Sequence, residues 1–306
     1  MGIKDIVKGV LGRSAGASTS HELARSRDPA VLRLLDDFKA GYDTKVKDFY
    51  DYLPSDVRPL FCDDALYHRA RYIDMCSQAY GAVVIELGSD KPFITHFLRQ
   101  LHPASEFHTI SIDIPFSPYP ITRIDIESER FPFESHSATD VIFTEVLEHL
   151  FRDPAWTIAE ISRVLAPGGN LFLTTPNACG MDVLMNLLLQ LNPNGRNQFY
   201  EAIESGHPHL WTASECRTLL EAHGLEVQEL TTVDYYPMHV PEAVKAFLAE
   251  HSSDPALNGQ VLRIRARKVA DVDGPVDIPA VFPQSRPVQL KGALLEWAKR
   301  QTNQAG

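Results

Sequence analysis

The residues best suited to chemistry are two glutamates and three histidines that lie between positions 145 and 209. Glu145, Glu148 and His149 are spaced so that one helical turn would place their side chains on the same face. Carboxylates and imidazoles bind divalent ions such as Mg²⁺ or Mn²⁺, and an ion held by these three residues and His207 would acidify a substrate hydroxyl. Without a metal, a neutral imidazole of His149, His207 or His209 can accept the proton of that hydroxyl. Glu148 and His149 can also simply brace a strand-to-helix turn, so all three interpretations stay open.

The elements that must position these residues alternate between strand and helix from about residue 82 onward. Short apolar runs predict seven strands, at residues 83–85, 108–112, 122–126, 141–143, 171–175, 227–233 and 261–266. Between them, Asp153-Pro154 is a helix-start signal, and Thr212 with Glu215 matches a capping box. The alternation predicts an α/β fold, Rossmann-like, with a mostly parallel seven-stranded sheet and helices on both faces.

The chain divides into three predicted parts. Residues 1–79 are expected to form a helical N-terminal extension without evident chemistry, with one helix after Asp28-Pro29 and another over about residues 64–79. Residues 80–269 hold the alternating elements, and residues 179–210 within them are a candidate lid over a substrate pocket. Residues 270–306 are expected to be a tail with a short helix.

The first strand-to-helix turn is the expected ligand site, because such sheets bind ligands beyond the carboxyl ends of their strands. That turn carries Glu86, Gly88 and Ser89, and Asp113 ends the next strand. A carboxylate at this place can accept both hydrogen bonds from a ribose diol. Taken alone, the pattern is equally typical of an ordinary turn.

Three later segments, taken in order, resemble class I S-adenosylmethionine (SAM) dependent methyltransferases. They are Asp140 to Leu150 with its Glu-Val-Leu-Glu-His run, the Leu165-Ala-Pro-Gly-Gly169 turn, and Leu171 to Asn177. The resemblance covers roughly residues 80–235 and implies a methyltransferase domain with SAM as methyl donor.

The resemblance also implies which positions contact SAM. In chain order they are Glu86, Gly88 and Ser89 in the loop, Asp113 at the ribose, Asp125 and Ile126 at the adenine, and Thr144 and Glu145 at the methionine part. The family's loop usually carries two more glycines, where this chain has Asp90 and Pro92. Glycine permits close backbone approach and positive φ, so we expect this loop to follow a different path.

The expected activity is O-methylation of a polar small molecule or a glycan precursor by in-line methyl transfer, with Glu145, His149 and His207 as candidate catalytic residues. The Glu-x-x-Glu-His run with a distant histidine also resembles small-RNA 3′-terminal 2′-O-methyltransferases and ubiquinone-pathway O-methyltransferases. A metal-dependent enzyme that uses Glu145, Glu148, His149 and His207 is therefore one alternative. An inactive methyltransferase fold that serves as a binding module is another, because the loop is altered.

The composition limits which binding partners and which cell compartment we expect for the protein. A formal charge of −11 over 306 residues argues against a nucleic-acid substrate. Four scattered cysteines without a CxxC pair, and no apolar run of membrane-spanning length, predict a cytoplasmic protein. Amphipathic spacing in residues 3–11 and 290–298 predicts terminal helices that pack on their own domain or on a partner, or that contact a membrane surface. The oligomeric state stays open.

Overall fold

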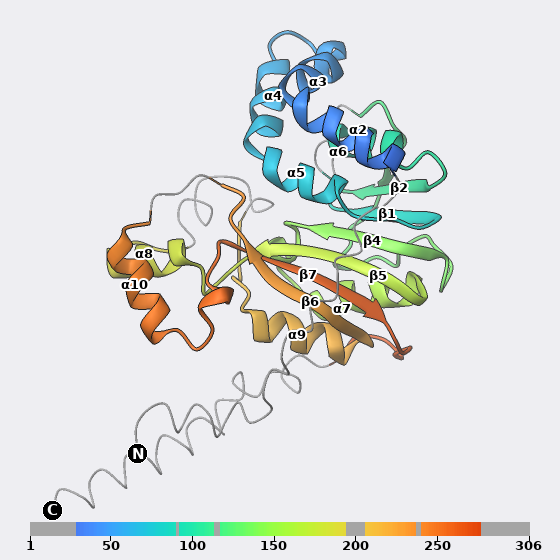
Figure 1. The fold of residues 1–306 in the computed structure, drawn as a ribbon. Coiled ribbons are helices and arrows are strands. Elements are labelled where there is room, and N and C mark those ends of the chain that lie inside the picture. The colour runs from blue at the N-terminus through green and yellow to red at the C-terminus, as the bar shows by residue number, and fades with distance from the viewer. Residues whose placement is uncertain (1–28, 90–91, 113–116, 194–205, 237–239, 277–306) are drawn as a thin grey trace, which may run out of the picture.

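A computed structural model describes residues 29–89, 92–112, 117–193, 206–236 and 240–276. Its centre is a seven-stranded sheet with the strand order β3-β2-β1-β4-β5-β7-β6 (Figure 1). Strands β1 to β5 pair in parallel, and β7 runs antiparallel between β5 and β6. The strand order reverses between β1 and β4, the place where a doubly wound sheet opens a crevice for a ligand. The Rossmann-like fold predicted from the sequence is confirmed.

All seven predicted strands are present, with shifted ends. They are β1 (Val83–Leu87), β2 (Glu106–Ser111), β3 (Thr122–Arg123), β4 (Ala138–Thr144), β5 (Leu165–Pro176), β6 (Leu225–Val233) and β7 (Val261–Lys268). The prediction of a strand over residues 122–126 is too long, because Asp125 begins a turn. Its carbonyl oxygen accepts hydrogen bonds from the backbone N–H groups of Ser128 and Glu129.

Helices cover both faces of the sheet. Figure 1 shows α2 to α6 on one side and α7 and α9 on the other. The helices of these two layers are α2 (Pro29–Ala40), α3 (Tyr42–Phe49), α4 (Arg58–Tyr67), α5 (Arg69–Cys76), α6 (Pro92–Leu101), α7 (Pro154–Val164) and α9 (Ala213–Ala222). Two more helices, α8 (Met181–Leu188) and α10 (Glu242–His251), contact each other beside the sheet. Short 3₁₀ turns are η1 (Tyr50–Tyr52), η2 (Leu147–His149) and η5 (Pro255–Leu257).

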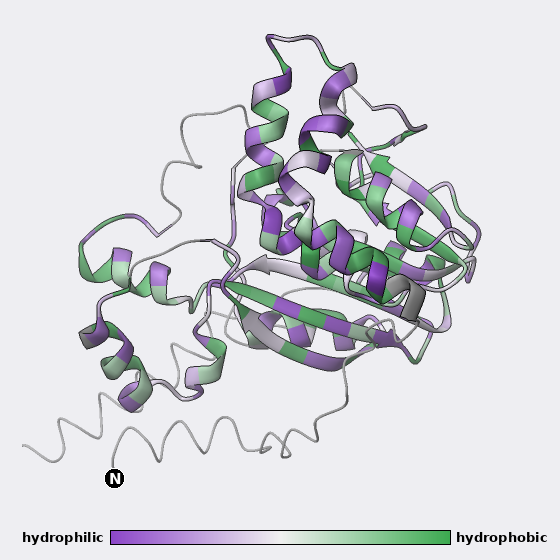
Figure 2. Ribbon diagram, turned by 45° about the horizontal axis from the view of Figure 1, so that its top comes forward, coloured by the Kyte–Doolittle hydropathy of each residue, from purple (hydrophilic) through white to green (hydrophobic). Residues whose placement is uncertain are grey.

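Alternate residues of the central strands belong to two different hydrophobic cores. Val141 and Phe143 of β4 join the core beneath α7 and α9, whereas Ile142 joins the core beneath the N-terminal helices. Figure 2 shows the covering helices in alternating apolar and polar bands, as expected for helices that bury one face. The central strands are apolar on both faces because both faces are covered.

Two local predictions are confirmed, and one is wrong. The Asp153 side chain accepts a hydrogen bond from the Ala155 N–H at the start of α7, and Thr212 and Glu215 form the capping box of α9. The single helix predicted over residues 64–79 is instead two helices, α4 and α5, which are separated at His68. This break matters for the site, because residues on both sides of it line the cavity described below.

Several predictions fall outside the described residues: both terminal amphipathic segments, most of the tail, and residues 194–205 of the candidate lid. Within the described ranges, no helix is long and apolar enough to cross a membrane.

A buried ion pair connects α5 to β7. Arg263 Nε donates to Asp74 Oδ2 over 2.7 Å, and the Arg263 side chain is 4% exposed. The hydroxyl of Tyr235, which follows β6, donates to the same Asp74 oxygen over 2.7 Å. Arg263 Nη1 also donates to Glu229 Oε1 over 2.8 Å. These contacts fix the position of α5 over the sheet.

We predict that Asp74→Ala lowers the free energy of unfolding by about 3 kcal/mol, because it leaves the buried Arg263 guanidinium without its main counter-charge. Urea unfolding followed by circular dichroism measures this loss. Asp36→Ala is the control, because the Asp36 side chain is 79% exposed and lies 3.9 Å from Lys39. A change of less than about 0.5 kcal/mol is expected there. Equal losses in the two variants would contradict the role assigned to the buried pair.

Candidate functional site

A cavity of about 780 Å³ opens at the carboxyl ends of β1, β2 and β4. One part of its wall comes from the turns that follow these strands, and another comes from α4 and α5. A volume of this size is within the range of ligand pockets in proteins. The cavity lies where the strand order predicts a ligand.

The turn after β1 is shaped by one glycine. Gly88 has φ +68, and a Cβ atom placed on it would lie 2.5 Å from Val146 Cγ2. Glycine is therefore required both for the backbone conformation and for the close approach of the two turns. The next residue, Ser89, is buried and lines the cavity.

Glu86 lies at the end of β1 and is buried against the helix that follows. Its carboxylate accepts a hydrogen bond from the Thr95 hydroxyl of α6. Burial raises the pKa of Glu86, although hydrogen bonds from Thr95 and Ser89 oppose that shift. The side chain therefore contacts both the cavity and the start of α6.

Asp125 and Ile126 line the cavity, as the sequence predicted, but the Asp125 carboxylate already has partners. It accepts hydrogen bonds from the Glu127 N–H, the Ser128 hydroxyl and Arg152 Nη1. Burial would raise the pKa of Asp125, but these donors outweigh it and lower the pKa. The structure thus adds Arg152, which the sequence analysis missed, to this rim of the cavity.

One residue of the predicted cofactor site, Asp113, lies outside the described residues, as do Asp90 and Lys91 of the altered loop. Ser111 and Ile112, which immediately precede Asp113, line the cavity, so the end of β2 reaches the site.

Glu145 does not belong to the helical turn predicted for it. Its φ is +54, and the turn η2 begins only at Leu147, so Glu145 does not share a helical face with Glu148 and His149. Thr144 and Glu145 both line the cavity, and the Glu145 N–H donates to the Thr174 carbonyl over 2.8 Å.

The Glu145 carboxylate is buried beside a guanidinium. Its Oε1 atom has no hydrogen-bond partner among the described residues. Burial raises the pKa of Glu145, while the charge of Arg71 opposes the rise. A buried polar atom without a partner is costly, and a ligand that supplies a donor would relieve that cost.

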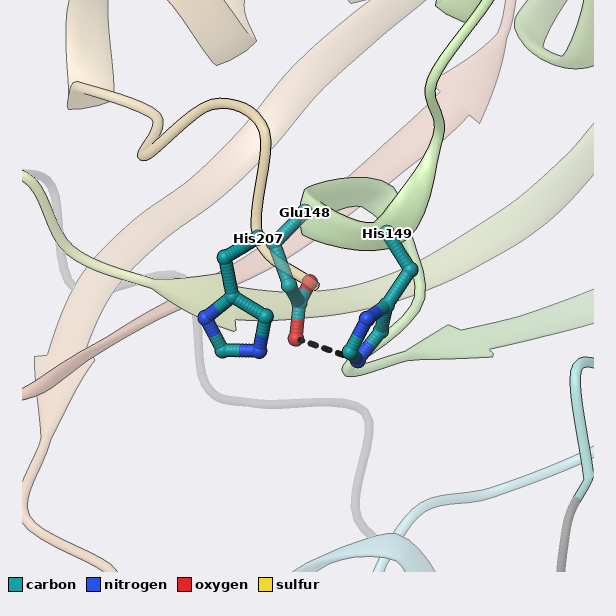
Figure 3. Close-up of side chains that lie close together, drawn as sticks. All are labelled: Glu148, His149 and His207. Atoms are coloured by element: carbon teal, nitrogen blue, oxygen red, sulfur yellow. Dashed lines mark ion pairs between the residues drawn. The ribbon is translucent and has the colours of Figure 1, made fainter. Parts of the chain in front are cut away.

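Glu148, His149 and His207 form a cluster (Figure 3). One ligand atom from each lies within 4.8 Å of the others, and Glu148 Oε1 is 3.9 Å from His149 Nε2. Figure 3 shows Glu148 and His149 on η2, with His207 reaching them from a separate loop. His149 Nδ1 is 3.0 Å from the Gly206 carbonyl oxygen. That carbonyl can only accept, so Nδ1 carries the proton and Nε2 points its lone pair toward the cluster.

Two residues of this cluster, Glu148 and His207, have pKa values far from their usual ones. Burial and the Glu145 carboxylate raise the pKa of Glu148 well above its usual value, against a hydrogen bond from the Thr175 hydroxyl. Burial and the neighbouring His149 lower the pKa of His207 to about 4. His207 is therefore neutral at physiological pH, as both a proton acceptor and a metal ligand must be.

The N-terminal helices contribute residues that the sequence analysis did not identify. Tyr67, His68, Arg71 and Tyr72 of α4, α5 and the break between them line the cavity, and Tyr236 joins them from the segment after β6. The extension therefore contributes to the cavity wall, which the sequence analysis did not predict. In the sequence, the only sign of this contribution was Arg71, an arginine among residues that become buried. That sign does not show which group the arginine would contact.

His209 and helix α8 of the lid segment lie away from the cavity, whereas His207 of the same segment lines it. His209 is not among the residues that line the cavity, and its Nε2 lies 3.5 Å from a Glu215 oxygen. Trp211 is buried, with its indole N–H donating to the Leu147 carbonyl, which fits a packing role. Helix α8 packs against α10, so only Pro176 and His207 represent this part of the chain in the cavity wall.

We predict that Gly88→Ala lowers the free energy of unfolding by about 3 kcal/mol, from left-handed backbone strain together with overpacking against Val146. Urea unfolding measures it. Gly274→Ala is the matched control, because Gly274 has φ +108 and a Cβ there would meet nothing within 4 Å. In Gly274→Ala only the backbone strain should lower the free energy of unfolding, by about 1–2 kcal/mol. A Gly88 variant no less stable than the Gly274 variant would contradict the close approach of the two turns.

Comparisons with known proteins agree with this architecture. A family model described as "Methyltransferase domain" matches residues 60–230, more than half of the chain. Ubiquinone biosynthesis O-methyltransferases from Pseudomonas paraeruginosa and Nitrosococcus oceani are both 25% identical to the chain, over 202 and 201 residues. These matches cover 60% of this chain and 81% and 76% of the respective relatives.

Two solved structures are also similar. A SAM dependent methyltransferase from Archaeoglobus fulgidus has a TM-score of 0.49 at 12% identity, covering 68% of this chain and 99% of the other. The 1,6-didemethyltoxoflavin-N1-methyltransferase of Burkholderia thailandensis, with bound S-adenosylhomocysteine, has a TM-score of 0.44 at 14% identity, covering 79% and 88%.

Proposed function

The chain belongs to the class I SAM-dependent methyltransferases, and from that membership we propose that it methylates a hydroxyl oxygen of a polar small molecule or a glycan precursor. The observation that carries the proposal is that the turn after β1 and the pair His149 and His207 line the same cavity. The relatives named ubiquinone biosynthesis O-methyltransferases support oxygen as the acceptor atom.

The residues of the cavity fit SAM. Gly88 gives the turn after β1 its left-handed backbone conformation, beside the buried Ser89, and both residues line the cavity. Glu145 Oε1 and Arg71 Nε are both buried without a hydrogen-bond partner among the described residues. A carboxylate and a guanidinium are the groups that a ligand with an ammonium and a carboxylate would need.

Each cofactor residue then has a proposed task. Glu145, with Thr144 beside it, holds the ammonium group, and Arg71 holds the carboxylate. Arg71 thereby compensates for the glycines that the loop lacks. The remaining proposed contacts are those of Glu86, Gly88 and Ser89 in the first turn, Asp113 at the ribose, and Asp125 and Ile126 at the adenine.

The chain's own contribution to the reaction is to position the acceptor and remove its proton. When bound, SAM supplies an electrophilic methyl group on sulfur. His149 is held by its Nδ1 contact to Gly206, so its Nε2 can accept the acceptor's hydroxyl proton. His207 is a neutral imidazole beside it, with its ring centroid 4.6 Å from that of His149. Glu145 acts through cofactor placement, because an aligned methyl group and nucleophile account for much of the rate.

We predict that calorimetry detects binding of both SAM and S-adenosylhomocysteine, and that Arg71→Met weakens SAM binding at least tenfold. The expected loss is one or more charged hydrogen bonds of about 1.5–3 kcal/mol each. Arg69→Met is the control, because Arg69 lies on the same helix, is 46% exposed and pairs with Asp43 outside the cavity. Absence of heat at millimolar ligand would favour the inactive binding module instead. An unchanged dissociation constant in Arg71→Met would remove Arg71 from the site.

A metal-assisted form of the reaction is the second candidate, and the closeness of three ligand atoms favours it. Glu148, His149 and His207 would hold Mg²⁺ or Mn²⁺, and the positions left open would bind and acidify the acceptor hydroxyl. A cation would also offset the charge of two neighbouring buried carboxylates, Glu145 and Glu148. Glu145 lies outside this cluster, so the four-residue ligand set expected from the sequence is reduced to three.

If the metal candidate is correct, Mn²⁺ should bind wild-type protein in an electron paramagnetic resonance titration, and His207→Gln should weaken that binding at least tenfold. EDTA should abolish methyl transfer, and added Mg²⁺ or Mn²⁺ should restore it. His209→Gln is the control, because His209 does not line the cavity. Activity that is indifferent to EDTA but falls in His149→Gln would instead favour the metal-free mechanism.

A further inference from the structure

Two stacked tyrosines form part of the cavity wall at a place that the proposed chemistry does not use. The rings of Tyr67 and Tyr236 have centroids 4.8 Å apart and an interplanar angle of 17°. Tyr67 ends α4, and Tyr236 follows β6, so the pair joins two distant parts of the chain. Tyr67 is 60% exposed although it lines the cavity, so it presents aromatic surface to a ligand.

His68 fixes this pair in place. The Tyr236 hydroxyl lies 2.9 Å from His68 Nδ1, and His68 Nε2 lies 3.6 Å from an Asp64 oxygen. The Tyr236 N–H also donates to Gln260 Oε1 over 3.1 Å. We call Tyr67, His68 and Tyr236 the tyrosine–histidine wall. Because His68 and Gln260 both hold Tyr236, the wall has its shape before a ligand binds and so offers a preorganised surface.

The hydroxyl that Tyr236 contributes to the wall is uncharged. Burial and the Glu145 carboxylate raise the pKa of Tyr236, so its phenol stays neutral at physiological pH. A neutral phenol can both donate and accept a hydrogen bond. The wall thus combines the flat apolar face of the tyrosine rings with polar atoms that can form hydrogen bonds with hydroxyl groups.

Carboxyl side chains outnumber guanidinium side chains in the cavity lining. The carboxyls are those of Glu86, Asp125, Glu127, Glu145 and Glu148, and the guanidiniums are those of Arg71 and Arg152. Arg152 is paired with Asp125 at 2.7 Å, and Arg71 interacts with Glu145. Neither guanidinium is left to neutralise a charged acceptor, so the lining disfavours an anionic one.

We propose that the tyrosine–histidine wall is the acceptor subsite and that it takes a neutral ring bearing several hydroxyls, of the sugar class. The C–H face of such a ring would pack on the tyrosines. Its hydroxyls would meet the many polar groups of the same lining, among them Glu148, His149 and His207. A phenol, with one or two hydroxyls, would form hydrogen bonds with fewer of these groups than a sugar ring can. This inference rests on the proposed function, because it names the acceptor class of the same site.

The test measures acceptor binding without requiring methyl transfer. Protein loaded with S-adenosylhomocysteine, with its loading confirmed by calorimetry, is titrated in saturation-transfer difference NMR with three probes. These are methyl α-D-glucopyranoside, its anionic counterpart methyl α-D-glucopyranosiduronate, and catechol. The neutral glycoside is expected to bind more tightly than the other two.

Substitutions at Tyr67 then locate the binding. Tyr67→Ala should weaken binding of the neutral glycoside about fivefold, the scale of one lost aromatic packing contact, whereas Tyr67→Phe should retain it. Leu60→Ala is the control, because Leu60 lies on the same helix, is 70% exposed and does not line the cavity. Tyr67 is itself largely exposed, so its loss should not prevent folding.

The outcomes separate the inference from the proposed function. Tighter binding of catechol or of the anionic sugar would overturn the sugar class, and equal effects of Tyr67→Ala and Leu60→Ala would overturn the subsite. Glycoside binding at the wall in a protein that transfers no methyl group would support the subsite and count against the proposed reaction. Methyl transfer to a phenol without glycoside binding would do the reverse.

Discussion

The site depends on the close approach of two turns that follow neighbouring parallel strands. Strands β1 and β4 pair so that Leu87 lies beside Phe143, and their carboxyl ends therefore reach the same edge of the sheet. Immediately beyond, Gly88 lies against the Val146 side chain with no room for a Cβ atom. This contact places the turn expected to bind the cofactor directly beside η2, which carries Glu148 and His149. If the two turns moved apart, the donor and acceptor parts of the cavity would separate.

The same edge of the sheet concentrates buried charge. Glu86, Glu145 and Glu148 are all buried enough for desolvation to raise their pKa values, and Arg71 is the cation that opposes this for Glu145. Such an arrangement is unfavourable for folding unless the rest of the structure holds it in place. The buried pair of Asp74 and Arg263 does so, because it anchors α5 and hence Arg71 over the sheet. The contacts that stabilise this arrangement therefore lie away from the cavity. The cavity itself keeps polar groups for which a bound ligand can provide hydrogen-bond partners.

The sequence predicted those features that local chemistry determines. Alternating apolar runs identified all seven strands, and the caps at Asp153 and Thr212 lie where the residue types require them. Glu145 shows where local reasoning fails, because helical spacing suggested a shared face with Glu148, whereas positive φ at Glu145 turns the chain before η2 begins. Tyr67 and Tyr236 could not be paired from sequence at all. Their stacking depends on how α4 and the segment after β6 pack on the completed sheet, and no short-range pattern encodes that packing.

The tautomer of His149 serves both candidate mechanisms, so the choice between them depends on Glu148. The Gly206 carbonyl fixes the proton on Nδ1 and leaves Nε2 as an acceptor for either a hydroxyl proton or a metal ion. Burial and Glu145 favour the protonated form of Glu148, and a protonated carboxyl is a poor metal ligand. A divalent ion would therefore have to displace that proton, which makes its binding weaken as the pH falls. Without an ion, the protonated Glu148 is neutral and can donate a hydrogen bond to an acceptor hydroxyl, and His149 remains the group able to take the proton away. The buried environment of Glu148 therefore bears on both of the roles proposed for the two histidines.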